Sequence, residues 1–233
     1  MKTNLMKNYP VECQQCFFKT TLCKALSERE FNSLFKLTKQ GKFQKGEVIF
    51  RQNEKTEHLV FLTKGMVKLV YSAQGKDIII AIEKAQTLLG LSSILNEDLN
   101  ISSIVAIEDC RGCIIDISAF KKTMLLNRRF MFEVITISTR MFRSSIFNFI
   151  SIAHKQSNGR IADVLIFLSE SIYQSRSFAL SLSRQELAEF AGCSKELIIR
   201  TLQHFSADGI ITISGKKVAI IDVERLHQIS RIG

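Results

Sequence analysis

The chain has 233 residues, of which 46% are hydrophobic and 23% are charged. These proportions are typical of a globular protein and exclude an intrinsically disordered chain. No apolar run reaches the roughly 18 residues that a membrane-spanning helix needs, so we expect no membrane association. The N-terminus lacks the apolar core of a signal peptide, and we therefore expect a cytoplasmic protein. In that compartment the six cysteines indicate metal binding, redox chemistry or core packing rather than disulfides.

The formal net charge of +10 favours a polyanionic partner such as nucleic acid. The excess is uneven along the chain. Residues 1–50 carry nine Lys and Arg against four acidic residues, and residues 119–150 carry six against one. Charge alone does not establish DNA binding, so the motifs must decide.

Residues 26–118, which follow a cysteine-containing segment at 1–25, are predicted to form a β domain. Short apolar runs separated by turn signals indicate strands at 48–51, 59–62, 66–71, 77–82, 103–107 and 112–116. Many short strands without long intervening helices favour a barrel or roll. Spacing alone does not distinguish this architecture from a β-sandwich.

Residues 119–154 are predicted to form one long helix. Two apolar stripes repeat at helical spacing, one of Phe130, Val134, Ile137 and Met141 and one of Met131, Ile135, Phe142, Ile146, Phe149 and Ala153. Such a helix must bury two faces, one against the β domain and one against a second copy of itself. We assign the dimer contact to Val134, Ile137 and Met141. The alternative is a single core helix in a monomer.

Residues 155–233 are predicted to form a helix-turn-helix domain with a wing. Ser183-Arg-Gln-Glu186 is a capping box, and Gly192 ends the helix that it begins. Ser194 can cap a second helix that runs to about Ala207. Two short helices joined by a tight Gly-containing turn form a helix-turn-helix. The segment 210–221 after it has the pattern of a β-hairpin, with a turn at Gly215-Lys-Lys217.

The order of β domain, long helix and winged helix-turn-helix resembles the Crp/Fnr transcription regulators. SRQELAEFAGCSKELIIRTLQHFSADGII (183–211) is similar to the family's DNA-recognition motif, and KGEVIFRQNEKTEHLVFLTKGMVKL (45–69) is similar to the start of its β-roll. The resemblance covers nearly the whole chain. It implies a β-roll of the cyclic-nucleotide-binding type, a homodimer, a palindromic double-stranded DNA operator and contact with RNA polymerase.

The resemblance also implies which residues of the second motif helix read bases. At the matching positions this chain has Lys195, Glu196 and Arg200, where Glu can accept from cytosine and Arg can bind guanine. Ile199 stands between them and can contact a thymine methyl group. Ser194 is placed for a phosphate oxygen at the helix N-terminus. The alternative for Glu196 and Arg200 is a surface ion pair.

Cyclic AMP is not expected as the effector. Family members that bind it carry an acidic residue and an Arg-Ser pair in the roll, whereas this chain has Leu88 and Asn100-Ile101 at the matching positions. A buried phosphate without its arginine is an uncompensated charge.

The cysteines instead resemble the Fnr pattern, which implies a [4Fe–4S] cluster on Cys13, Cys16, Cys23 and Cys113. Six residues separate Cys16 from Cys23, whereas the family usually has five. Two alternatives stay open: a zinc site on Cys13, Cys16, Cys110 and Cys113, or thiols that bind no metal and respond directly to oxidation.

The sequence therefore predicts a regulator that responds to oxygen, nitric oxide or redox state. A Ser/His/Asp arrangement, a P-loop and a GxGxxG motif are all absent from the sequence, so we expect no enzyme. One alternative is a regulator that binds a small molecule, other than cyclic AMP, in its roll. Another is a zinc-bound or redox structural protein that does not bind DNA.

Overall fold

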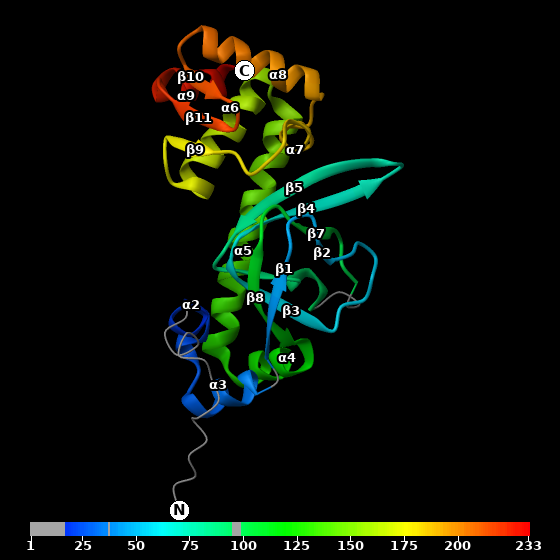
Figure 1. Cartoon of the computed structure of the whole chain (residues 1–233). Coiled ribbons are helices and arrows are strands. Elements are labelled where there is room, and N and C mark those ends of the chain that lie inside the picture. The colour runs from blue at the N-terminus through cyan, green and yellow to red at the C-terminus, as the bar shows by residue number, and fades with distance from the viewer. Residues whose placement is uncertain (1–16, 37, 95–98) are drawn as a thin grey trace, which may run out of the picture.

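The computed structural model of the chain describes residues 17–36, 38–94 and 99–233. Cys13 and Cys16 lie outside these residues. The β-roll lies between an N-terminal helical segment and the C-terminal domain, and one long helix runs alongside it (Figure 1). This arrangement confirms the predicted α+β fold class.

The N-terminal segment consists of α2 (Phe17–Thr20), the 3-10 helix η1 (Leu22–Ala25) and α3 (Glu28–Phe35). A capping box begins α3: the Ser27 hydroxyl accepts from the Glu30 amide, and the Glu30 carboxylate accepts from the Ser27 amide at 2.7 Å. Phe18 and Leu22 are buried in the same cluster as Phe61 of the roll. The segment therefore covers one outer face of the roll.

The roll consists of two antiparallel four-stranded sheets, ordered β1-β8-β3-β6 and β2-β7-β4-β5. Its strands are β1 (Lys39–Phe43), β2 (Val48–Phe50), β3 (His58–Lys64), β4 (Met66–Ala73), β5 (Lys76–Lys84), β6 (Thr87–Leu89), β7 (Ser103–Ala106) and β8 (Cys110–Asp116), and the short helix η2 (Leu91–Ser93) follows β6. Side chains alternate between the faces of β3. Val60 and Leu62 pack inside the roll, whereas Leu59 and Phe61 face the helices.

Two helices, not one, follow the roll: α4 (Ile117–Leu126) and α5 (Arg128–His154). The break lies at Asn127, whose backbone is extended and whose side chain accepts from the Phe130 amide to cap α5. Asn127 also donates to the carbonyl of Ala25 and the carboxylate of Glu30. These contacts attach the N-terminal segment to the start of α5.

The C-terminal domain consists of helices around a three-stranded sheet, ordered β10-β11-β9. Its elements are α6 (Ser157–Phe167), the π-helical η3 (Leu168–Tyr173), β9 (Ser177–Ala179), α7 (Arg184–Ala191), α8 (Lys195–Ala207), β10 (Ile211–Ser214), β11 (Lys217–Ile220) and α9 (Val223–Ile232). Within the described residues, no helix is long and apolar enough to cross a membrane.

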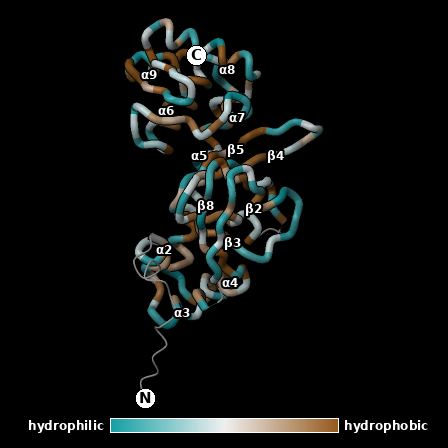
Figure 2. Tube along the Cα trace, viewed as in Figure 1, coloured by the Kyte–Doolittle hydropathy of each residue, from teal (hydrophilic) through white to brown (hydrophobic). Residues whose placement is uncertain are grey.

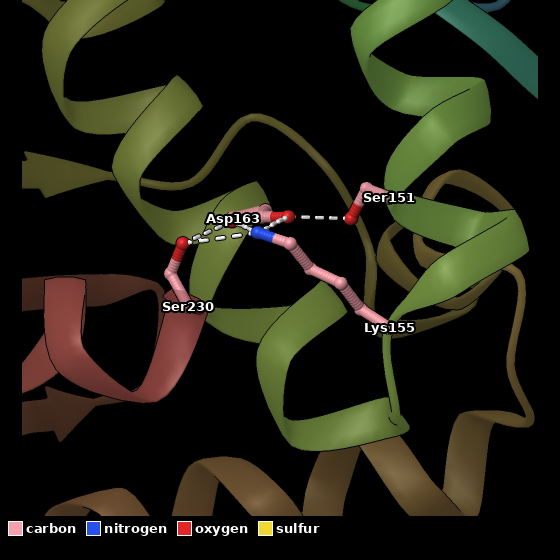
Figure 3. Close-up of polar contacts among 4 residues, drawn as sticks. All are labelled: Ser151, Lys155, Asp163 and Ser230. Carbon is pink, nitrogen blue, oxygen red and sulfur yellow. Dashed lines mark hydrogen bonds and ion pairs between the residues drawn. The ribbon is translucent and has the colours of Figure 1, made fainter. Parts of the chain in front are cut away.

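A polar cluster joins the long helix to this domain (Figure 3). The Asp163 carboxylate of α6 accepts from Ser151 of α5, from Lys155 after it and from Ser230 of α9. One carboxylate therefore links three helices at the point where the chain passes between them.

Candidate nucleic-acid interface

The first helix of the motif, α7, begins and ends as predicted. The Glu186 carboxylate accepts from the Ser183 amide at 2.7 Å, and the Ser183 hydroxyl accepts from the Glu186 amide at 3.2 Å. Gly192 ends α7 in the left-handed region with φ of +61°. A Cβ at this glycine would approach Ile152 of α5 to 3.2 Å, so the turn is also close to the long helix.

The second helix, α8, is buried on one face and exposed on the other. Its inner face is formed by Ile198, Thr201, Leu202 and Phe205. Ser194 caps the helix, with its hydroxyl 3.2 Å from the Leu197 amide that donates to it. The side chains of Lys195, Glu196, Ile199 and Arg200 lie together on the exposed face. The five residues selected from the sequence therefore lie on one accessible surface at the start of this helix.

The exposed face of α8 carries charges of both signs. Hydrogen bonds from the Glu196 amide and the Ser194 side chain lower the pKa of the Glu196 carboxyl. Glu196 is therefore an ionised acceptor at neutral pH and can accept from cytosine N4, while Arg200 can donate to guanine O6 and N7. The helix N-terminus adds exposed backbone N–H groups that suit a phosphate.

The wing adds two cations that the sequence-based assignment did not include among DNA-contacting residues. Lys216 and Lys217 are exposed at the turn between β10 and β11. The Arg184 guanidinium of α7 donates to the Gly215 carbonyl at 3.3 Å, which holds the turn beside the first helix. Burial lowers the pKa of Arg184. The adjacent lysines in a hairpin turn were the available sequence signal for this exposed cationic surface.

Two of the four predicted cluster ligands lie in one buried cluster. Cys23 of η1 and Cys113 of β8 are 2% and 6% exposed, and both belong to the cluster that contains Phe18 and Phe61. The folded chain thus brings the third N-terminal cysteine onto the roll face that carries Cys113. Among the described residues no group of three His, Cys, Asp or Glu side chains has the arrangement of a metal site.

Cys110 faces the other side of β8. It lies three residues before Cys113, and its thiol donates to the carbonyls of Met66 at 3.4 Å and Glu108 at 3.2 Å. It packs inside the roll rather than in the cluster of Cys113. Burial raises the pKa of the Cys110 thiol. The zinc alternative, which needs both cysteines on one metal, is not supported by this geometry.

Leu88 and Asn100, which the sequence analysis compared with a cyclic-nucleotide site, make contacts within the roll. Leu88 is fully buried in the outer cluster of the roll. Asn100 is buried and donates to the carbonyls of Arg51 and Glu54 at 3.1 and 3.0 Å, while it accepts from Ser93 at 2.9 Å. The Asn100 side chain is an uncharged amide whose oxygen and nitrogen both have partners within the roll.

Val134, Ile137 and Met141, to which the sequence analysis assigned the dimer contact, each contact their own chain. Val134 is buried in the outer cluster of the roll, and Ile137 packs against it. The Thr87 hydroxyl donates to the Met141 sulfur at 3.7 Å. The second apolar stripe of α5 is the exposed one, with Phe142 and Phe149 66% and 69% exposed.

Comparison with known proteins matches the roll and the C-terminal domain to two domain families. Residues 40–127 match the cyclic nucleotide-binding domain, and residues 159–229 match the Crp-like helix-turn-helix domain. The chain belongs to the Crp/Fnr family. This Crp/Fnr regulator is 26% identical over 210 residues to a CRP-like cAMP-activated global transcriptional regulator of Mycobacterium tuberculosis, covering 87% of this chain and 94% of the relative.

It is also 26% identical over 218 residues to the transcriptional activator protein Anr of Pseudomonas protegens, covering 90% of this chain and 88% of Anr. The structure of FixK2 from Bradyrhizobium japonicum superposes with a TM-score of 0.77 at 19% identity, over 83% of this chain and 97% of FixK2. The protein is therefore a DNA-binding transcription regulator and not an enzyme. The alternative of a structural protein without DNA binding is wrong.

Proposed function

We propose that this regulator is a cytoplasmic homodimer whose affinity for a palindromic operator is set by a [4Fe–4S] cluster on Cys13, Cys16, Cys23 and Cys113. The signal would be oxygen, nitric oxide or a change in redox state. The observation that carries the proposal is the burial of Cys23 and Cys113 in one cluster, although they are 90 positions apart in the sequence. Thiolates are the ligands that such clusters use.

When bound, the cluster would supply metal–thiolate bonds between the N-terminal segment and the roll, which oxygen or nitric oxide can break. The chain's own contacts connect that segment to the long helix. The Lys24 ammonium lies 3.0 Å from the Glu133 carboxylate of α5, and Asn127 donates to the Ala25 carbonyl. The position of the cysteine segment can therefore influence the first turns of α5.

The exposed stripe of α5 supports the homodimer. Its residues follow alternating steps of three and four: Phe132, Ile135, Thr139, Phe142, Ile146, Phe149 and Ala153. This is the heptad spacing of a two-stranded coiled coil, and a second copy of the same helix is the partner that matches it. Large aromatic side chains exposed along 22 residues of one helix need such a partner to be buried.

Pairing of α5 would place two copies of α8 on one side of the dimer. Helix-turn-helix dimers bind half-sites that are about one turn of DNA apart. Glu196, Ile199 and Arg200 would then read bases in each half-site, while Ser194 and Lys195 would contact phosphates or guanine. Contact with RNA polymerase belongs to the same proposal.

A small-molecule effector is the second candidate, and a cavity favours it. A space of about 490 Å³ lies between the turn after β5, helix α5 and η3, with Glu83 and Arg140 among its lining residues. The carboxyl and guanidinium groups could bind a polar ligand there. Direct oxidation of thiols without a metal is the remaining alternative.

The test is the absorption spectrum, with iron and sulfide content, of protein purified without oxygen. The cluster predicts a brown protein with a broad band near roughly 400 nm that air bleaches, and about four irons per chain. Cys23→Ser and Cys113→Ser should lose iron, whereas Cys110→Ser should retain it because its thiol faces the roll interior. A colourless protein after anaerobic reconstitution would leave the small-molecule or bare-thiol alternatives.

A further inference from the structure

The roll and the DNA-binding domain are joined by a shielded ion pair. The Lys68 ammonium of β4 lies 3.0 Å from the Glu186 carboxylate of α7, and the two side chains are 17% and 22% exposed. The residues are 118 positions apart in the sequence. Glu186 also completes the capping box of α7, since its second oxygen accepts from the Ser183 amide. The pair thus connects the sensor domain directly to the first helix of the motif.

The environment of the pair keeps both charges in place. Burial alone would raise the pKa of Glu186, but the Ser183 amide and the Lys68 ammonium outweigh it, and the pKa lies below its ordinary value. The carboxylate is therefore ionised at neutral pH and paired with the lysine. Removing one partner of such a pair leaves the other charge uncompensated in a partly buried site.

Further contacts surround the ion pair. Ser181 donates to the Glu108 carboxylate at 3.1 Å, and Lys84 of β5 donates to the Ile172 carbonyl of η3 at 3.2 Å. Met66, Val70 and Ile79 of the hairpin belong to the same apolar cluster as the core of the DNA-binding domain. Figure 2 shows hydrophobic residues at the base of the β4–β5 hairpin beside α7, and a more polar hairpin tip. The hairpin base is therefore a docking face for α7.

The covalent link between the two parts is short and not helical. Helix α5 ends at His154, and Lys155 and Gln156 both have extended backbone before α6 begins. An extended two-residue link does not by itself fix the angle between two helices, because each residue has two soft dihedral angles. The orientation of the domain consequently depends on noncovalent contacts between the two parts. The Asp163 cluster provides such contacts between α5, α6 and α9 at the link itself, and the Lys68–Glu186 pair provides one between the roll and α7.

We propose that Lys68 and Glu186 are positioning residues for DNA binding, which hold α8 in the orientation that a palindromic operator requires. Neither residue needs to touch DNA for this role. The inference rests on the proposed homodimer, since orientation relative to the roll matters only when two linked motifs must meet two half-sites. A single motif on a single half-site would bind equally well in either orientation.

The experiment compares a full palindromic site with a single half-site. Operator duplexes are selected from random sequence with the wild-type full-length protein, and affinities are measured for Lys68→Gln, Glu186→Gln and the double variant. Gln keeps a capping-box side chain at position 186. Lys76→Gln at the hairpin tip and Glu224→Gln in α9 are the matched controls, because both residues are exposed.

Each single variant should lose about fivefold or more in full-site affinity and keep its half-site affinity. The double variant should lose no more than the singles, because both substitutions remove the same contact. A purely electrostatic effect on DNA would overturn the proposal, with Lys68→Gln weakening and Glu186→Gln strengthening binding to both duplexes. Equal losses on both duplexes, unchanged affinity or tighter full-site binding would also overturn it. Wild-type protein without a full-site preference would instead refute the homodimeric function.

Discussion

The Lys155 ammonium lies 2.8 Å from one oxygen of the Asp163 carboxylate and 2.9 Å from the other, across the junction between α5 and α6 (Figure 3). Ser151 and Ser230 donate to the same carboxylate. A carboxylate that accepts several hydrogen bonds and pairs with a cation is difficult to replace, because the donors would be left without their acceptor. This cluster should therefore contribute to stability as well as to the geometry of the junction.

Asp163→Asn should lower the free energy of unfolding by about 1–2 kcal/mol, because it removes the charge that pairs with Lys155 from a partly exposed site. Chemical denaturation at neutral pH measures this loss. Glu224→Gln, at an exposed position of α9, should change stability by less than about 0.5 kcal/mol. Equal denaturation midpoints for Asp163→Asn and wild type would show that the cluster does not contribute to stability.

Phe142→Glu should convert the protein to a monomer without unfolding it, because Phe142 is 66% exposed within its own chain. A charge at the centre of a coiled-coil seam cannot be buried against a second copy. Analytical ultracentrifugation measures the change in mass. Leu125→Glu is the control, since Leu125 is 82% exposed and lies in α4, outside the stripe. If both variants remain dimeric, the exposed stripe of α5 is not the interface.

Val134→Ala, in contrast to Phe142→Glu, should affect folding and not dimerisation. We expect it to lower the free energy of unfolding by about 1–3 kcal/mol and to change dimer affinity little. Val134 is 3% exposed and packs against the roll of its own chain. Thermal or chemical unfolding of the dimer at several protein concentrations separates the two contributions. A loss of dimer affinity greater than the loss of fold stability would instead show that Val134 contributes to the dimer interface.

Arg200→Ala should weaken operator binding by about 1–3 kcal/mol and relax the preference for one base pair in each half-site. Binding to the selected operator and to duplexes with single half-site changes measures both effects. Lys217→Ala in the wing should instead weaken all duplexes to a similar extent, because a phosphate contact carries no base information. If Arg200→Ala weakened binding to all duplexes to the same extent, Arg200 would contact a phosphate and not a base.

The sequence predicted the features that local signals encode. Ser183 and Glu186 predict where α7 begins, and Gly192 predicts where it ends. The structure confirms both ends. The split of the expected long helix at Asn127 was missed, since no proline or glycine marks it and the break is held by contacts with Ala25 and Glu30. Strand β1 was also missed, because its KQGKF sequence carries little apolar alternation.

Contacts between distant parts of the chain were beyond sequence reasoning. Helical periodicity gave two apolar stripes on α5, but the choice of the stripe that meets the roll depends on how the strands fold. The spacing of Cys110 and Cys113 is that of a pair of metal ligands. In the structure both lie on strand β8, where they face opposite sides of the sheet. The Lys68–Glu186 pair had no local signal, as each residue is an ordinary charged side chain in its own element.

Glu83 predicts a pH dependence of stability. Burial raises the pKa of its carboxyl from 4.5 to about 7, although Thr87 and Arg140 act in the opposite direction. Between these two values the folded protein holds a proton that the unfolded chain has released, so the free energy of unfolding falls as pH rises from 4.5 to about 7. Above that range both states are ionised, and the full cost of the buried charge is present.

Glu83→Gln should therefore leave stability nearly unchanged at pH values below the ordinary carboxyl pKa and raise it by about 1–3 kcal/mol at a pH above the range of the Glu83 titration. The gain arises because the amide carries no charge into the partly buried site. Denaturant titrations across this range measure it, with Glu54→Gln at an exposed position of the roll as the control. Parallel profiles of stability against pH for Glu83→Gln and wild type would contradict this prediction. They would show that the Glu83 carboxyl has an ordinary pKa, so that the cavity beside Arg140 holds a negative charge throughout this pH range.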